Sequence, residues 1–256
     1  MRSNAEWRQW GKTDPLFGVA SWFGKTKDGP QPWKDDEFYP LGESDWADFA
    51  ARWERYGVDR TCCVEIGCGA GRLTKPMAGY FGVVIATDVS EGMVDYARRH
   101  VPAGNVLFSV ADGLRLAVAD GAATAAFSTH VFQHFDSPQN AVSCLREIHR
   151  ALAPGGTLMI HMMVYEWPAM ARFFERVYRW RKIMGQARAN WLRRTLRRGR
   201  WKPFMRIQHY EIAWVLRALK SIGFQDVEMT IAETRSTRDP HPFAFARKPA
   251  APGPAA

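Results

Sequence analysis

The 256-residue sequence lacks any long apolar run, and no stretch approaches the ~18 uncharged apolar residues of a membrane-spanning helix. Its first fourteen residues have no apolar signal-peptide core, so we expect a protein that is not exported and resides in the cytoplasm. The chain has four cysteines but no CxxC pair and no Cys/His ligand spacing, so we expect neither disulfides nor a zinc site of that kind. Disorder is excluded as the dominant state, since 46% of the residues are hydrophobic and 13% are aromatic.

Acidic residues are almost absent from one segment. Between Arg172 and Arg206 there are thirteen Arg or Lys residues and one acid, Glu175, a local balance of +12. The whole chain has a formal net charge of +9, so the rest of it is mildly acidic. Tryptophan is missing from residues 54–166, although six lie before this interval and five after it. This distribution indicates a conventional core covered by two aromatic segments.

Apolar runs and helical periods alternate from residue 61 onward. We expect strands at residues 61–66, 82–88, 105–110, 122–128, 157–163, 224–232 and 242–247. We expect helices at residues 71–80, from Ser90 onward, at 137–152 and at 210–222. This alternation predicts an α/β fold, a Rossmann-like, mostly parallel seven-stranded sheet covered on both faces. The last two strands have no helix between them, which predicts an antiparallel last strand.

Three alternating glycines, Gly67, Gly69 and Gly71, follow the first strand. Such a loop lets backbone N–H groups approach a ligand, and Asp88, at the tip of the second strand, can accept hydrogen bonds from ribose hydroxyls. A dinucleotide site prefers Gly-x-Gly-x-x-Gly, but here the third glycine comes two residues after the second. Glu65 would repel a diphosphate and attract an ammonium group. The pattern therefore favours a nucleoside that carries an amino acid.

The motifs VEIGCGAGRLT, ATDVS, VADG and LAPGG, within residues 58–163, resemble the class I S-adenosylmethionine-dependent methyltransferases of the small-molecule, methyltransferase-11/12 type. The resemblance implies S-adenosyl-L-methionine as cofactor and S-adenosyl-L-homocysteine as product. Two assignments keep an alternative: Arg72 contacts the cofactor carboxylate or is an exposed first-turn residue, and Met93 lies beside the adenine or is plain core. The implied cofactor-binding residues are Glu65, Gly67, Cys68, Gly69, Gly71, Arg72, Asp88, Val89, Met93, Asp112, Gly113, Thr129 and Val131.

Histidines supply the candidates for a general base, which helps when the acceptor is a hydroxyl. His130 and His134 follow the fourth strand, and a helical turn would put them on one face. His209 lies beside Tyr210 at the start of the last helix. The alternative is that these histidines pack around the cofactor and catalysis is by proximity alone. We expect no metal, because no carboxylate cluster lies near strand four, and we expect His241 to be a surface or structural residue.

The regions outside the core are expected to contact the acceptor. We predict an aromatic lid at residues 1–57, irregular up to its helical pattern at 46–53, a core at 58–163 and 208–248, a basic helical insertion at 164–207 and a disordered tail at 249–256. The resemblance places acceptor-binding elements in the lid and the insertion. Phe17 and Phe38 are further lid candidates. The alternative, favoured for any single one of these lid aromatics, is that it belongs to a satellite core against the sheet. The candidate acceptor-binding residues are Trp22, Trp33, Tyr39, Tyr165 and Tyr210.

Residues 172–206 leave three interpretations open: a helical cap with solvent-facing arginines, a surface that recognises an anionic acceptor, or a helix lying on an anionic membrane. Nucleic acid is disfavoured, because no RNA- or DNA-binding module is recognisable. We expect an enzyme that methylates an oxygen, less favourably a nitrogen, of a small anionic, lipid-like or sugar-like acceptor. The alternatives are a cofactor-binding protein that docks a membrane or partner, and a methyltransferase for RNA or protein. The sequence leaves the oligomeric state open.

Overall fold

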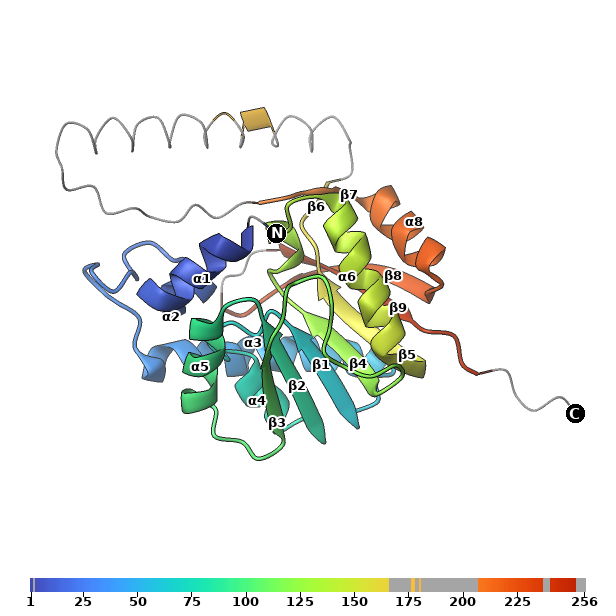
Figure 1. Ribbon diagram of the computed structural model, residues 1–256, viewed down its shortest axis with the longest axis horizontal. Helices are drawn as coiled ribbons and strands as arrows, with labels where there is room; N and C mark the ends of the chain where they lie inside the picture. Colours follow the sequence, from blue (N-terminus) through green and yellow to red (C-terminus); the bar gives the residue numbers. More distant parts are fainter. Residues whose placement is uncertain (2, 166–175, 178–179, 181–206, 237–239, 252–256) are drawn as a thin grey trace, which may run out of the picture.

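A seven-stranded sheet forms the centre of the computed structural model, which describes residues 1, 3–165, 176–177, 180, 207–236 and 240–251 (Figure 1). The strand order is β3-β2-β1-β4-β5-β9-β8, and β9 runs antiparallel to both of its neighbours while the other pairs are parallel. This arrangement confirms the predicted α/β sheet. The strands are β1 (Cys62–Ile66), β2 (Val83–Asp88), β3 (Val106–Val110), β4 (Ala123–Ser128), β5 (Leu152–His161), β8 (Gln225–Glu233) and β9 (Pro240–Arg247).

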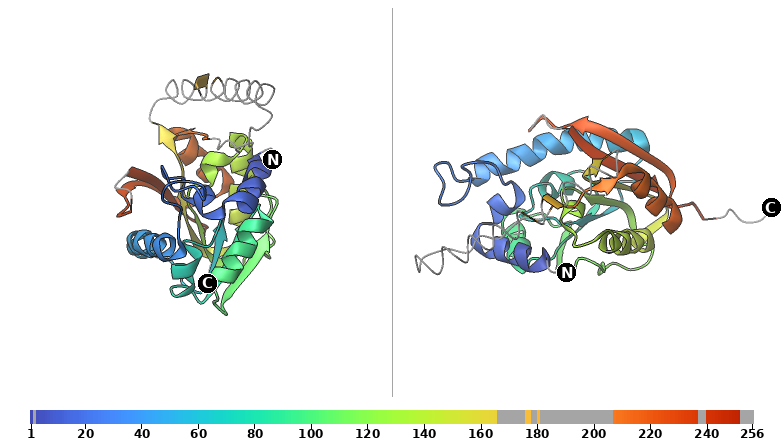
Figure 2. Two further views of the ribbon diagram at one scale, coloured as in Figure 1. Left: turned by 90° about the vertical axis from the view of Figure 1, so that its left-hand side faces the viewer. Right: turned by 90° about the horizontal axis from the view of Figure 1, so that it is seen from above.

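Helices cover both faces of this sheet (Figures 1 and 2). α3 (Asp35–Tyr56) and α4 (Thr74–Ala78) pack on one face, and α6 (Pro138–Ala151) and α8 (Ile212–Ile222) pack on the other. α5 (Glu91–His100) lies against β2 and β3 and contacts α1 (Ser3–Thr13) and α2 (Pro15–Val19). A 3₁₀ turn, η1 (Phe132–His134), follows β4, and β6 (Val164–Tyr165) pairs with β7 (Tyr210–Glu211) in a separate two-stranded sheet.

Much of the N-terminal segment is helical, which corrects the prediction of irregular structure before residue 46 for α1, α2 and the first half of α3; residues 20–34 are irregular as predicted. Three acids open α3, where they complement the helix dipole, and Gly57 ends it in a left-handed conformation with φ 93°. Buried apolar residues recur at helical spacing from Phe38 to Trp53. Phe38 packs in a cluster with the N-terminal helices and α5, and the later residues from Trp46 to Trp53 pack against the sheet. The indole Nε1 of Trp53 donates to Thr157 Oγ1 on β5 at 3.0 Å. The glycines and prolines of this segment obscured that period.

Two further predicted boundaries need correction. The helix predicted at 71–80 is the five-residue α4, with turns on either side of it. α8 begins at Ile212, so His209 and Tyr210 precede it instead of starting it. Apart from residues 176, 177 and 180, the basic segment 172–206 lies outside the described residues, as do residues 252–256 of the tail. Within the described part of the chain, no helix is long and apolar enough to cross a membrane.

Candidate active site

A cavity of about 400 Å³ lies at the edge of the sheet where the parallel strands β1, β2 and β4 end. Ligands of open α/β sheets bind at this edge. One end of the cavity, here called the acid–glycine end, is lined by Glu65, Gly67, Gly69 and Asp88. The other, called the histidine end, is lined by His130, His134 and His241. The cavity thus joins two chemically different surfaces.

The loop after β1 needs glycine for its backbone conformation. Gly67 has φ 76° and Gly69 has φ 54°, both in the left-handed region. The Gly67 and Cys68 N–H groups donate to the Thr87 carbonyl at 2.7 and 2.9 Å, which ties the loop to the end of β2. A Cβ atom on Gly67 would lie 2.1 Å from Val131 Cγ2. The loop therefore keeps its backbone close to the cavity, where a side chain would not fit.

Asp88 ends β2 and holds the glycine loop in place. Its Oδ2 accepts a hydrogen bond from the Gly69 N–H at 3.0 Å, and its Oδ1 accepts one from the Ser90 N–H at 2.9 Å. Burial raises the pKa of Asp88 to about 6, although these backbone donors act in the opposite direction. Each carboxylate oxygen keeps a further lone pair that a ligand hydroxyl in the cavity can use.

Glu65 is a buried carboxylate on β1, 3% exposed. Its Oε2 accepts a hydrogen bond from Thr74 Oγ1 at 2.6 Å. Burial raises the pKa of Glu65 to about 7, and the negative charge of Asp88 adds to that rise. A ligand cation would relieve both effects, so the acid–glycine end suits a positively charged group.

Arg72 lines the cavity beside these acids and is not an exposed first-turn residue. Its Nη1 lies 2.6 Å from Oδ2 of Asp45, which is itself buried. Its Nε is buried without a hydrogen-bond partner. The guanidinium is therefore fixed by α3 and has a donor left for a ligand carboxylate.

Most of the predicted cofactor-binding residues line this one cavity. Two do not: Gly71 packs against Ala97 and Val101, and the Asp112 carboxylate accepts from the Leu114 and Arg115 N–H groups at 2.7 Å each. These backbone hydrogen bonds lower the pKa of Asp112. Those that line it are Glu65, Gly67, Cys68, Gly69, Arg72, Asp88, Val89, Met93, Gly113, Thr129 and Val131.

His130 and His134 both line the histidine end, but they do not share a helical face as predicted. His130 has φ 57°, a left-handed conformation that interrupts any helical turn. Its Nδ1 lies 2.9 Å from Thr129 Oγ1, and burial lowers its pKa well below the usual value. His134 belongs to η1 and packs on Trp7, with ring centroids 4.7 Å apart. The two imidazoles therefore have separate environments.

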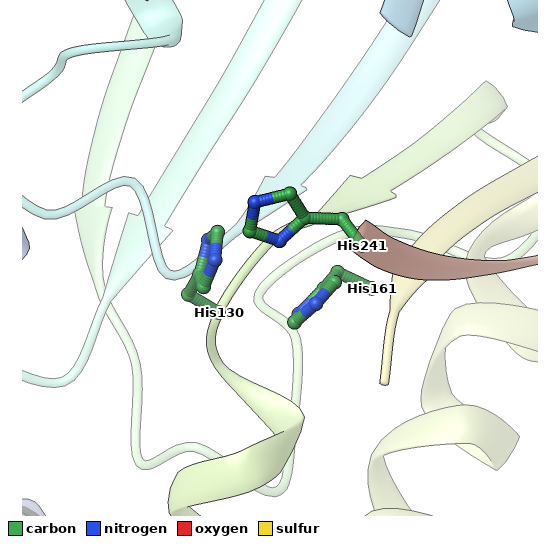
Figure 3. Close-up of side chains that lie close together, drawn as sticks. All are labelled: His130, His161 and His241. Carbon is green, nitrogen blue, oxygen red and sulfur yellow. The ribbon is translucent and has the colours of Figure 1, made fainter. Parts of the chain in front are cut away.

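Two further histidines lie beside His130, as Figure 3 shows. The ring centroid of His161 is 4.4 Å from that of His130, and the centroid of His241 is 5.1 Å from it. Burial lowers the pKa of His161 to about 3, so its imidazole is neutral. The sequence pattern gave no sign of this cluster, because its members come from three distant segments.

Of the five aromatic acceptor candidates, Trp22 lines the cavity. Trp33 packs on Trp22, with ring centroids 5.1 Å apart. Tyr39 and Tyr210 are buried, and their hydroxyls donate to the carbonyls of Ala70 and Phe132 at 2.9 and 2.7 Å. Tyr165 packs on His209, with ring centroids 4.4 Å apart. The described residues that line the cavity do not include Trp33, Tyr39, Tyr165, Tyr210 or the predicted base His209.

The N-terminal helices also contribute to the cavity wall. Asn4 Nδ2 donates to the Asp112 carbonyl at 2.7 Å, and Arg8 Nε donates to the Val89 carbonyl at 3.2 Å. These bonds fix α1 over the ends of β2 and β3. No sequence motif marks this contact. The wall residues that the sequence analysis did not name include Met1, Ser3, Asn4, Trp7, Val19, Gln133, Thr234 and Ser236.

Residues 64–160 match the family model described as "Methyltransferase domain". The chain is 31% identical over 122 residues to the O-methyltransferase cnsE of Penicillium expansum, covering 44% of this chain and 43% of that protein. It is 30% identical over 129 residues to the malonyl-[acyl-carrier protein] O-methyltransferase of Hahella chejuensis, covering 50% of this chain and 43% of that protein. The match thus spans less than half the length of these curated relatives.

Solved structures share the fold over nearly the whole chain. The magnesium protoporphyrin IX methyltransferase of Synechocystis PCC 6803, crystallised with bound S-adenosylhomocysteine, superposes with a TM-score of 0.61. The superposition covers 96% of this chain and 99% of that one at 17% sequence identity. The likeness of fold therefore extends beyond the segment that the family model matches.

Proposed function

We propose that the chain carries a class I S-adenosylmethionine-dependent methyltransferase domain and transfers the methyl group of that cofactor to an oxygen atom of a small-molecule acceptor. The observation that carries the proposal is one cavity, whose acid–glycine end is continuous with the histidine end. A donor held at the first end would present its reacting group to an acceptor at the second. The choice of oxygen is supported by two curated relatives named as O-methyltransferases.

The residues of the acid–glycine end fit S-adenosylmethionine. Asp88 has lone pairs left for the two ribose hydroxyls, and Glu65 offers a buried negative charge to the α-ammonium group. Arg72 keeps a donor for the α-carboxylate, and the missing Cβ of Gly67 leaves room for Val131, which also lines the cavity. When bound, the cofactor supplies a methyl group that its sulfonium already activates.

The protein's task is to align the acceptor and to exclude water. Trp7 and Trp22 from the N-terminal segment and Phe49 from α3 give the cavity apolar walls. His134 lines the acceptor side and lies 3.1 Å from the Gln133 side-chain nitrogen. We assign His134 as the candidate that receives the acceptor proton or positions the acceptor oxygen, because the lowered pKa of His130 makes that imidazole a weak base.

Calorimetry with S-adenosylhomocysteine tests the cofactor site. The wild-type protein should bind it at one site per chain. Asp88→Ala removes both the ribose acceptor and the loop hydrogen bond, so binding should fall at least about 100-fold, the effect of losing two charge-assisted hydrogen bonds. Asp95→Ala is the control, because Asp95 lies on the exposed side of α5 and pairs with Arg98.

Normal binding by Asp88→Ala would contradict the site assignment. A wild-type protein that binds the cofactor product but transfers no methyl group from S-adenosylmethionine to any of a panel of hydroxylated acceptors would instead favour a cofactor-binding role.

A further inference from the structure

Three histidines from three neighbouring strands meet at the histidine end of the cavity (Figure 3). His130 follows the carboxyl end of β4, and His161 is the last residue of β5. His241 lies near the start of β9, which runs antiparallel and therefore begins at the same edge of the sheet. One ring nitrogen of each histidine lies within 4.8 Å of the others. The topology of β4, β5 and β9 thus brings together residues that are far apart in the sequence.

His161 has unsatisfied polar atoms. Its side chain is 1% exposed, and both Nδ1 and Nε2 are buried without a hydrogen-bond partner. A buried polar atom without a partner destabilises the fold, so such atoms are rare in folded proteins. The neighbours that face these nitrogens are the imidazoles of His130 and His241. A group that accepts one lone pair from each of the three rings would satisfy one nitrogen of His161.

The orientation of His130 is fixed from outside the cluster. Its Nδ1 is within hydrogen-bond distance of Thr129 Oγ1, which leaves Nε2 for the cluster. Histidines that bind metal ions almost always have the second ring nitrogen held in this way by a hydrogen-bonding neighbour. Thr129 therefore occupies the place of such a supporting residue.

We propose that His130, His161 and His241 bind a first-row divalent transition-metal ion of the Zn²⁺ or Co²⁺ type, with one coordination position left open toward the cavity. Imidazole nitrogens suit these ions, whereas Mg²⁺ and Ca²⁺ require oxygen ligands. Around a tetrahedral zinc ion with ~2.0–2.1 Å bonds, ligand atoms lie roughly 3.3 Å apart, so small rotations of the side chains from the 4.8 Å arrangement close the site. Three protein ligands with an open position are typical of catalytic sites.

The open position gives the metal a role that rests on the proposed function. His130 and His241 line the cavity, so an acceptor hydroxyl there can complete the coordination. A bound hydroxyl loses its proton more readily, because the metal stabilises the anion. The O–H bond breaks, and its proton passes to His134 or to water in the cavity. The electron pair left on oxygen forms the new bond to the methyl carbon as the carbon–sulfur bond breaks, and that bond's electron pair stays on the sulfur of S-adenosylhomocysteine. This step needs no carboxylate cluster.

Cobalt spectroscopy tests the site without an acceptor. Tag-free protein is dialysed against a chelator and titrated with Co²⁺, and the visible bands of tetrahedral cobalt are followed. We expect saturation at one ion per chain and displacement by Zn²⁺. His161→Phe and His241→Asn should each weaken binding more than 100-fold. Thr129→Val should weaken it about 10- to 100-fold, the usual effect of losing a supporting hydrogen bond. His149→Gln is the matched control, since His149 packs on Phe224 away from the cavity.

Three results would overturn the metal site. The first is no saturable uptake of Co²⁺, and the second is unchanged Co²⁺ uptake in both His161→Phe and His241→Asn. The third is a thiolate-to-cobalt absorption band, which would place the ion on a cysteine. Circular dichroism checks the fold, and His241→Asn retains the test if the buried His161→Phe does not fold. Calorimetry with S-adenosylhomocysteine on the same samples separates the two proposals. Cofactor binding without metal uptake rejects the three-histidine metal site alone. Metal uptake without cofactor binding rejects the proposed function but supports the metal site.

Discussion

The two ends of the cavity are built in opposite ways. The acid–glycine end comes from one continuous β1–loop–α4 segment and the tip of the adjacent strand β2, so Glu65, Gly67 and Asp88 lie within 24 residues of each other in the sequence. The histidine end is assembled from β4, β9 and the loops beside them, and α1 adds Trp7 to it. A local segment carries its own pattern in the sequence, whereas a surface assembled by the sheet topology does not.

The fold was predictable to within a few residues wherever apolar period and turn residues agree. All seven strands overlap their predicted ranges, although β5 begins at Leu152, five residues before its predicted start. The buried parallel strands are marked in the sequence by short apolar runs bounded by glycine or charge. The helices α1 and α2 and the first half of α3 were not predicted. Gly11 interrupts the helical pattern of α1, Gly18 that of α2, and Pro40 and Gly42 that of α3. There the packing against α5 and the sheet overrides the weak local preference.

The candidate site follows the same division. Gly67, Gly69 and Asp88 could be placed on the cavity from their spacing, whereas Gly71 of the same loop packs against α5 instead. The convergence of His161 and His241 could not, because it depends on β9 lying next to β5 and on its direction. His130 and His134 have the spacing of a helical pair, but the positive φ of His130 separates them, and sequence spacing does not predict such a conformation.

The largest loss of cofactor affinity should come from Gly67→Ala, which disturbs the backbone of the loop at the acid–glycine end. A Cβ there would meet Val131 Cγ2 at 2.1 Å, and a non-glycine residue at φ 76° costs a further ~1–2 kcal/mol. We expect at least about a 100-fold loss of S-adenosylhomocysteine affinity in calorimetry. Gly104→Ala is the control, because nothing lies within 4 Å of its Cβ position. Equal affinities in the two variants would refute the close approach of the loop to the ligand.

Glu65→Gln should have a smaller effect, because it removes the charge and keeps the shape. We expect S-adenosylhomocysteine affinity to fall about 10- to 100-fold, the usual range for losing a hydrogen bond to a charged group. Unchanged affinity would show that the ammonium group lies elsewhere.

The same variant should change the stability of the free protein in a pH-dependent way. The pKa of Glu65 is raised from 4.5 to about 7, so the wild-type protein loses stability as pH rises through that interval. The shift corresponds to roughly 3 kcal/mol. Glu65→Gln should therefore unfold at higher denaturant concentration than wild type above pH 7, and the difference should vanish near pH 4.

Cofactor affinity should itself depend on pH. Ionised Glu65 attracts the ammonium group, and its pKa of about 7 means that this attraction is present above pH 7 and is lost as pH falls through it. Between pH 8 and pH 6 we expect about a tenfold loss of S-adenosylhomocysteine affinity. The loss should steepen below pH 6, where Asp88 also takes up a proton. If the affinity of the wild-type protein does not change with pH, or if it changes equally in Glu65→Gln, then Glu65 does not bind the ammonium group.

Tyr210→Phe should have the smallest effect on cofactor affinity, because it alters the histidine end of the cavity and not the acid–glycine end. The variant loses the buried hydrogen bond to the Phe132 carbonyl, which holds the turn of the histidine end, at a cost of ~1 kcal/mol. We expect Tm to fall by roughly 2–4 °C in thermal unfolding. S-adenosylhomocysteine affinity should stay within about twofold of wild type, because Tyr210 does not touch the acid–glycine end. A large loss of cofactor affinity would mean that the two ends are coupled.

The central claim is that one cavity places a cofactor at the acid–glycine end with its reacting sulfur toward the histidine end. A crystal structure with S-adenosylhomocysteine tests it most directly. We predict ribose hydroxyls on Asp88, the α-ammonium group on Glu65, and the sulfur facing the space bordered by His130 and His134. A ligand bound with its ribose away from Asp88, or with its sulfur turned from the histidines, would contradict the account.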